Sequence, residues 1–125
     1  MTWEMNYRDQ DRGKSSVSQV RTIIAFGTFD VFHYGHLRMI ERASALGDRL
    51  VVGVSSDQLN LRKKGRRPVF SQDERLAIVG SLKAVDQVFL EESLELKRSY
   101  IEHFSANVLV MGDDWYGRFD EFGEP

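Results

Sequence analysis

Four short apolar runs, separated by polar or amphipathic stretches, constrain the fold more than any other feature of this chain. The runs are Thr22–Gly27, Arg49–Ser56, Ala84–Leu90 and Ala106–Gly112. Their length and their β-branched residues are typical of strands, and the near-continuous apolar character of Arg49–Ser56 is typical of a parallel sheet covered on both faces. Strands that alternate with helices at short spacing predict an α/β fold with a four-stranded parallel sheet and right-handed crossovers.

Helical patterns fill the intervals between these runs. The apolar residues of His36–Gly47 suit one face of a helix. Ser71, followed three residues later by Glu74, has the spacing of a capping box and predicts the start of a second helix. Ser93–Phe104 predicts a third helix. The basic segment Arg62–Pro68 interrupts the pattern, and we expect it to form a loop.

The composition excludes several classes of site and partner. The chain has 125 residues, of which 42% are hydrophobic and 29% charged, as is ordinary for one globular domain. It has no cysteine, which excludes disulfides, thiolate nucleophiles and zinc–thiolate sites. No apolar run approaches the roughly 20 residues that a membrane-spanning helix needs. The net charge of −2 favours neither nucleic acid nor a membrane as a partner.

The first 20 residues are polar and show no hydrophobic period. We expect residues 1–20 to form a flexible arm, or to be an extension added by cloning, and residues 21–125 to form the folded domain. The start of the chain has no apolar stretch of the kind found in secretory signals, so the simplest predicted location is the cytoplasm.

Polar segments follow three of the four predicted strands. They are Gly27–His36, Ser55–Asn60 and Gly112–Asp120. In open parallel sheets ligands bind beyond the carboxyl ends of the strands, and all of these ends meet at one edge. The three segments therefore predict a shared binding site at that edge.

Two histidines stand three residues apart where the first strand gives way to a helix. At a helix start, His33 and His36 share a face with backbone N–H groups that have no partner in the helix, and this combination favours an anion such as phosphate. Gly35 would leave room for phosphate to approach the backbone. The alternatives are two ordinary surface histidines, or a metal site with Asp30 as the nearest further ligand.

The basic segment Arg62–Pro68 holds five cations. It could be a solvated, mobile loop; equally, its place after the second strand and opposite the histidines is consistent with a contact with phosphate. No aromatic residue occurs between Arg62 and Arg67, whereas single-stranded nucleic acid sites usually interleave aromatics with cations.

Two other polar groups have a structural as well as a functional interpretation. Arg75 lies in the first turn of a predicted helix, where the macrodipole disfavours a cation; from the residues alone, a surface ion pair with Asp73 or Glu74 is plausible. Asp113 and Asp114 follow the last strand. They could bind a metal, accept hydrogen bonds or cap a turn.

The stretch GTFDVFHYGHLRMIERASALGD resembles the HxGH signature region of the nucleotidyltransferase superfamily, and in particular the cytidylyltransferase family. Further similarity lies in VGVSSDQLN and in VMGDDWYGRFD, and it extends over about Thr22 to Phe122. Within the family, the chain is most similar to the cytidylyltransferases that act on glycerol 3-phosphate. The resemblance implies a Rossmann-like, three-layer sandwich.

The family resemblance also implies an activity. An oxygen of an alcohol phosphate would attack the α-phosphorus of CTP, and pyrophosphate would leave without a covalent enzyme intermediate. Glycerol 3-phosphate is the expected acceptor, giving CDP-glycerol. Phosphoethanolamine, phosphocholine or a sugar phosphate are alternatives, as is a nucleotide-binding module without catalysis. Mg²⁺ is expected as a cofactor bound mainly through the phosphates of CTP, and a homodimer is expected.

The resemblance assigns roles to individual residues. The catalytic residues would be His33, His36 and Lys63. The nucleotide would contact Gly27, Thr28, Phe29, Asp30, the two histidines, Asp113 and Asp114. The phosphates and the acceptor would contact Lys63, Lys64, Arg66, Arg75, Lys83 and Trp115. No protein ligand is assigned to a metal.

The chain departs from the family after its predicted fourth strand. Relatives continue with a fifth strand and an R-T-x-G-[IV]-S-[ST] signature, which nothing from Phe119 onward resembles. We expect that the domain is truncated at its C-terminus; if it naturally lacks this segment, catalysis should be weak or absent. Loss of the fifth strand would expose the edge of the fourth strand to pairing.

Overall fold

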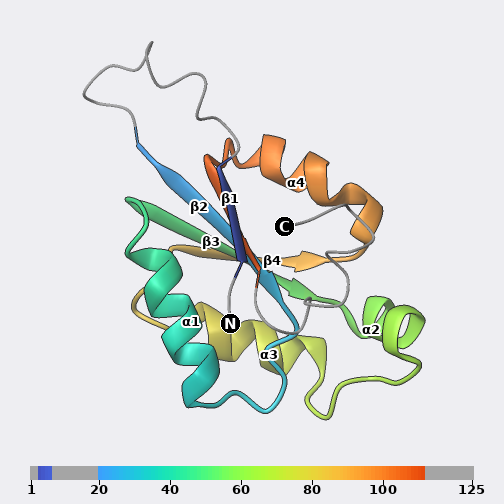
Figure 1. The fold of residues 1–125 in the computed structure, drawn as a ribbon. Helices are drawn as coiled ribbons and strands as arrows, with labels where there is room; N and C mark the ends of the chain where they lie inside the picture. Colours follow the sequence, from blue (N-terminus) through green and yellow to red (C-terminus); the bar gives the residue numbers. More distant parts are fainter. Residues whose placement is uncertain (1–2, 7–19, 112–125) are drawn as a thin grey trace.

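The fold is seen in a computed structural model that describes residues 3–6 and 20–111 (Figure 1). One five-stranded sheet forms its centre, with the strand order β1-β5-β2-β3-β4. The strands β2, β3, β4 and β5 run parallel, and β1 is antiparallel to β5. The predicted α/β fold and its four parallel strands are confirmed. The strands are β1 (Trp3–Asn6), β2 (Thr22–Gly27), β3 (Arg49–Ser55), β4 (Gln87–Glu91) and β5 (Val108–Met111).

Helices cover both faces of this sheet, as Figure 1 shows. On one face α1 and α3 pack against Ile23, Ala25, Val52 and other strand residues. On the other face α4 packs against strand residues that include Ile24. Neighbouring residues of β2 thus serve opposite cores, as the period of two requires in a strand buried on both sides. The helices are α1 (Tyr34–Ser44), α2 (Asp57–Lys64), α3 (Gln72–Gly80), the 3₁₀ helix η2 (Leu94–Leu96) and α4 (Lys97–His103).

The capping box predicted for α3 is present. The Glu74 amide donates to Ser71 Oγ at 3.3 Å, and the Ser71 amide donates to Glu74 Oε1 at 3.0 Å. These two hydrogen bonds satisfy backbone donors that the first turn of a helix leaves without partners. They fix where α3 begins, and therefore the length of the loop that leads into it from α2.

The helix α2 corrects the prediction that the whole of Arg62–Pro68 is a loop. Its N-cap is Ser56, whose hydroxyl accepts from the Leu59 amide at 2.9 Å. It ends at Gly65, which takes the left-handed conformation (φ 78°) that glycine adopts without steric cost. The three cations before Gly65 therefore occupy the last turn of a helix, where the macrodipole favours positive charge.

The strand β1 corrects the expectation that residues 1–20 form a flexible arm throughout. Residues 3–6 run antiparallel to β5, with Trp3 opposite Met111 and Asn6 opposite Val108. The edge of β5 that was expected to be exposed is therefore paired over these four residues. A four-residue segment is too short for its hydrophobic period to identify it as a strand, and its partner lies about a hundred residues further along the chain.

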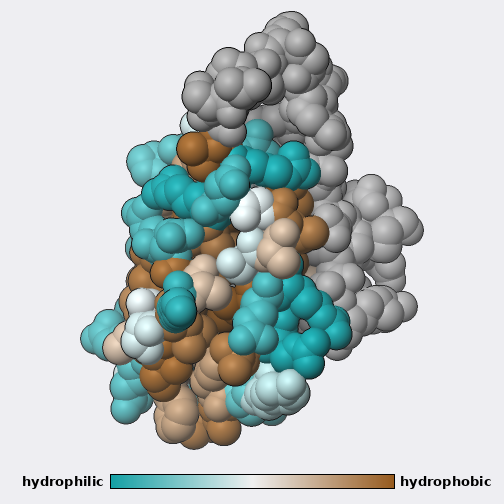
Figure 2. Space-filling view, turned by 90° about the vertical axis from the view of Figure 1, so that its left-hand side faces the viewer, coloured by the Kyte–Doolittle hydropathy of each residue, from teal (hydrophilic) through white to brown (hydrophobic). Residues whose placement is uncertain are grey.

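The surface over the α1 side is mixed in character. Figure 2, which faces this side, shows hydrophobic residues reaching the surface toward its lower end, where α1 begins, between hydrophilic ones. Near this end of the molecule Val31 and Val69 are 50% and 77% exposed. No helix in the described ranges is long and apolar enough to cross a membrane. The predictions made for Asp113, Asp114, Trp115 and the C-terminal end lie outside the described residues.

Candidate active site

A pocket of about 410 Å³ opens at the carboxyl edge of the parallel strands, the edge predicted from the sequence. It lies between the loop after β2, the start of α1, α2 and the loop that precedes α3. The lining includes three cationic side chains, two imidazoles and one carboxylate, so the pocket suits an anionic ligand. Its volume is typical of sites for small molecules. Its lining in the described part of the chain is Thr28, Asp30, His33, His36, Asn60, Lys64, Arg66, Arg67, Pro68 and Val69.

The two histidines form the N-terminal cap of α1. The Gly35 amide donates to His33 Nδ1 at 3.0 Å, and the His33 amide donates to His36 Nδ1 at 3.2 Å. Together they make a capping box in which two imidazoles take the places usually held by serine and glutamate. The ring centroids lie 4.0 Å apart, so the predicted pairing of His33 and His36 on one face of the helix start is present.

These hydrogen bonds select a tautomer for each ring. A nitrogen that accepts a backbone N–H carries no proton, so in a neutral ring the proton lies on Nε2. His33 and His36 both accept through Nδ1 and both line the pocket. In each ring, Nε2–H is consequently the group that can donate a hydrogen bond to a phosphate oxygen. Both rings lie at the N-terminus of α1, where the helix dipole is positive.

The two glycines of this segment make room for side chains. A Cβ at Gly35 would lie 2.8 Å from His33 Cε1, and a Cβ at Gly27 would lie 2.8 Å from Phe29 Cε2. These glycines therefore make room for the rings of His33 and Phe29, and their contact with phosphate or nucleotide stays a prediction. Phe29 is buried, and its ring makes a T-shaped contact with the His36 ring at 5.6 Å between centroids. This contact helps to hold the His36 ring in place.

The loop between β2 and α1 holds an unusual backbone conformation. Phe29 and Val31 have φ values of 55° and 46°, in the left-handed region that side chains rarely adopt. For a β-branched residue such as Val31 this conformation is strained, at a cost of about 1–3 kcal/mol. Strain of this kind persists only where surrounding contacts hold it, and here it accompanies the turn that carries Asp30 and the histidines.

Asp30 supplies one such contact, a role that was not predicted; its contact with nucleotide stays a prediction. Its Oδ1 accepts from the amides of Val31 (3.1 Å) and Phe70 (2.9 Å), and its Oδ2 accepts from the Val69 amide (2.7 Å). Burial acts to raise the pKa of this carboxyl, but the three backbone hydrogen bonds and the charge of Arg75 leave the pKa below its ordinary value. Asp30 therefore anchors the end of the basic loop to the histidine loop.

Arg75 corrects both interpretations made from the sequence. It is fully buried and therefore forms no surface ion pair with Asp73 or Glu74. Its Nη2 donates to Asp57 Oδ1 at 2.7 Å, and its other donors reach backbone carbonyls. Those carbonyls belong to Thr28 (3.0 Å), Ser55 (2.7 Å) and Phe70 (2.9 Å). Arg75 thus joins the ends of β2 and β3 to the loop before α3, and it acts beneath the pocket instead of reaching a ligand phosphate.

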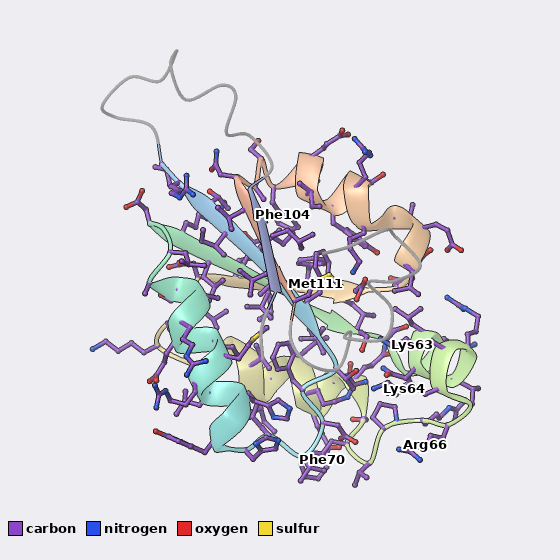
Figure 3. The ribbon with its side chains drawn as sticks, viewed as in Figure 1. Lys63, Lys64, Arg66, Phe70, Phe104 and Met111 are labelled. Carbon is purple, nitrogen blue, oxygen red and sulfur yellow. The ribbon has the colours of Figure 1, made fainter. Side chains whose placement is uncertain are left out.

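Among the predicted lysines, Lys64 and not Lys63 lines the pocket. Its Nζ lies 3.3 Å from Thr28 Oγ1. Lys63 acts electrostatically on Glu91, whose pKa burial raises and the charges of Lys97 and Lys63 lower in part. Figure 3 shows Lys63, Lys64 and Arg66 on α2 and the loop that follows it. The predicted contact is therefore best assigned to Lys64 together with Arg66.

Lys83 lies far from this pocket. It is an exposed residue of the turn that joins α3 to β4. In the same turn the Asp86 amide donates to the Leu50 carbonyl at 2.9 Å, and Leu50 stands at the beginning of β3. The turn therefore lies at the amino edge of the sheet, opposite the carboxyl edge, and the described structure does not bring Lys83 to the pocket.

Sequence reasoning missed several lining residues. Asn60 is almost fully buried and contacts Ser55 and Thr28, but it lies on a helix that the hydrophobic period did not reveal. Arg67, the other cation of the loop, also faces the pocket. A signal for Asn60 did exist, because the Ser56 N-cap and Gly65 delimit a short helix in the sequence and place Asn60 inside its second turn.

Comparison with known proteins identifies the family of the chain. The cytidylyltransferase-like family model matches residues 24–124. A glycerol-3-phosphate cytidylyltransferase of Bacillus subtilis (strain 168) is 42% identical over 101 residues, which are 81% of this chain and 78% of the relative. A protein of the same name from Staphylococcus aureus (strain NCTC 8325) is 36% identical over 81% of this chain and 76% of the relative.

A solved structure is also similar. It is described as the lipopolysaccharide core biosynthesis protein from Thermoplasma volcanium GSS1 and aligns with a TM-score of 0.61 at 34% sequence identity. The alignment covers 67% of this chain and 68% of that one. The matched family region contains the histidine cap, α2 and the basic loop, which together form the pocket. The chain belongs to the cytidylyltransferase-like family.

Proposed function

We propose that this protein transfers CMP from CTP to glycerol 3-phosphate, giving CDP-glycerol and pyrophosphate. The observation that carries the proposal is the cationic pocket at the carboxyl edge, where two imidazoles cap a helix and present Nε2–H groups beside Lys64 and Arg66. The names of the relatives that match most of this chain support CTP and glycerol 3-phosphate as the substrate pair.

The geometry supports an in-line phosphoryl transfer. A phosphate oxygen of the acceptor forms a bond to the α-phosphorus of CTP, while the bond from that phosphorus to the bridging oxygen of the β-phosphate breaks. The electron pair of the broken bond leaves with pyrophosphate. The protein positions the two substrates and stabilises the charge on the oxygens around phosphorus. We assign this stabilisation of charge to His33, His36, Lys64 and Arg66.

Mg²⁺ enters the proposal as part of the nucleotide substrate. The pocket's carboxylate, Asp30, already accepts three backbone N–H groups, which leaves it poorly suited to act as a metal ligand. The surrounding cations suit the phosphates of CTP, which can carry the metal themselves. When bound, Mg²⁺ would neutralise part of the triphosphate charge. A homodimer and a cytoplasmic location remain predictions.

The test is pyrophosphate release from CTP and Mg²⁺ with a panel of acceptors. The panel contains glycerol 3-phosphate, phosphoethanolamine, phosphocholine and a sugar phosphate. We expect the highest kcat/KM with glycerol 3-phosphate. Faster turnover of another acceptor would keep the chemistry and replace the substrate. CTP binding by calorimetry with no turnover of any acceptor would overturn the proposal and identify a nucleotide-binding module.

A further inference from the structure

Three buried polar side chains form a closed ring of hydrogen bonds beneath the pocket. Asn60 Nδ2 donates to Ser55 Oγ at 2.8 Å, Ser55 Oγ donates to Thr28 Oγ1 at 3.1 Å, and Thr28 Oγ1 donates to Asn60 Oδ1 at 3.1 Å. Each residue is at most 4% exposed. They come from the end of β3, the loop after β2 and α2, so the ring joins three of the segments that build the pocket.

The direction of every hydrogen bond in this ring is fixed by one backbone carbonyl. The Ser56 carbonyl can only accept, and it accepts from Asn60 Nδ2 at 2.8 Å. The amide oxygen of Asn60 must then face Thr28, whose hydroxyl has one proton and gives it to that oxygen. Both lone pairs of the Thr28 hydroxyl are consequently directed at donors, namely Ser55 Oγ and Lys64 Nζ.

Lys64 is thereby held by a neutral acceptor. Its Nζ donates to Thr28 Oγ1 at 3.3 Å, and within the described residues no carboxylate lies within ion-pair distance of it. A lysine side chain normally loses considerable rotamer freedom when it binds an anion. A hydroxyl that holds the ammonium group in advance reduces this loss without neutralising the charge.

We propose that Asn60 is a positioning residue which, through the Thr28 hydroxyl, holds Lys64 ready for a polyphosphate anion in the pocket. The inference rests on the proposed function for the identity of that anion, the triphosphate of CTP. Asn60 is almost fully buried, and its amide nitrogen and oxygen are both engaged in hydrogen bonds inside the protein. Its effect on anion binding must therefore pass through Lys64, whereas a merely structural asparagine would affect binding whether or not Lys64 is present.

The experiment is a double-mutant cycle on anion affinity in the full chain. Calorimetry with inorganic tripolyphosphate gives Kd for the wild type, Asn60→Ala, Lys64→Ala and the double variant. We expect Asn60→Ala to weaken binding by about 3- to 10-fold when Lys64 is present and by less than about 2-fold in the Lys64→Ala background, as for coupled neighbours. Arg42→Ala, which removes an exposed cation from the last turn of α1, is the control and should leave Kd unchanged.

Equal weakening in both backgrounds, or no weakening in either, would overturn the proposal. If Asn60→Ala does not fold, the cycle is run with Thr28→Val. Thr28→Ser, which keeps the hydroxyl, should then restore most of the affinity; failure of this rescue also contradicts the proposal. Transfer of CMP is assayed separately. A protein that shows the coupling but no transfer would refute the proposed function and leave the role of Asn60 standing.

Discussion

Two lysines at the same edge of the sheet have opposite surroundings. Lys64 points its ammonium group at the Thr28 hydroxyl and lines the open pocket. Lys97 is largely buried on the other face, where its Nζ donates to Glu91 Oε2 at 2.7 Å and lies 3.7 Å from the centre of the Phe26 ring. The charge of Lys64 is therefore available to a ligand, whereas the charge of Lys97 is paired with Glu91 inside the protein. Of these two lysines, the one without a carboxylate partner in the described residues is the one suited to bind an anion.

Burial shifts both members of the internal pair toward their neutral forms. It raises the pKa of Glu91 and lowers the pKa of Lys97, and the attraction between the two charges opposes each shift. Within the described residues Glu91 Oε1 has no hydrogen-bond partner, which makes the pair more dependent on Lys97. Such a pair contributes little net stability when intact and destabilises strongly when one partner is removed.

The largest expected effect is therefore on the internal pair. Lys97→Met leaves the Glu91 carboxylate buried without its counterion, and we expect it to lower the free energy of unfolding by about 3–5 kcal/mol, measured by urea denaturation. The double variant Lys97→Met/Glu91→Leu removes both charges and should recover most of that loss. A loss below about 1 kcal/mol in the single variant would show that the two lysines do not differ as described.

An intermediate effect is expected at the loop anchor. Asp30→Asn keeps the shape but cannot accept from all three backbone amides, so stability should fall by about 1–2 kcal/mol. The folded-state pKa of Asp30 lies below its ordinary value, so its contribution is present above the ordinary value and is lost as pH falls through the folded value. Urea denaturation of wild type and variant should therefore differ at pH 7 and converge only as the pH falls below the ordinary value of 3.8 and through the lower folded-state pKa; a difference that grows on acidification would contradict the assignment.

The smallest effect on stability is expected at Lys64. Lys64→Ala removes an ammonium group that no carboxylate neutralises in the described part of the chain, so unfolding should change by less than about 0.5 kcal/mol. Binding of CTP should nevertheless weaken about 10-fold, and the dependence of Kd on salt should become shallower. Calorimetry at two salt concentrations measures both quantities. If Lys64→Ala lowered the free energy of unfolding as much as Lys97→Met does, the proposed difference between the two lysines would be contradicted.

Local sequence patterns predicted the parts of the molecule that local physics determines. The buried strands were recognised because a strand covered on both faces is apolar throughout, and the start of α3 because Ser71 and Glu74 satisfy each other's backbone groups. The histidine pair was expected at a helix start, and it lies there. Its capping role was not predicted, because imidazoles rarely replace the usual Ser and Glu.

The remaining differences come from contacts that only the folded chain brings together. A helix turns by about 100° per residue, so once Arg62–Pro68 was taken as a loop nothing could decide between Lys63 and Lys64. Arg75 was expected to contact phosphate or to form a surface ion pair, because a local pattern does not show that an arginine is buried. Its partners come from the three segments that meet beneath it. The pairing of β1 depends on β5, at the other end of the described chain.

The measurement that tests the site most directly removes the imidazoles while keeping the helix cap. His33→Asn together with His36→Gln preserves a capping box, because asparagine is a good N-cap and glutamine can return the hydrogen bond at the third position. With thermal unfolding shown to be unchanged, we expect the rate of CMP transfer from CTP to glycerol 3-phosphate to fall by about 10²–10³-fold or more. A folded variant that transfers CMP at the wild-type rate would contradict the assignment of the histidine pair to the triphosphate.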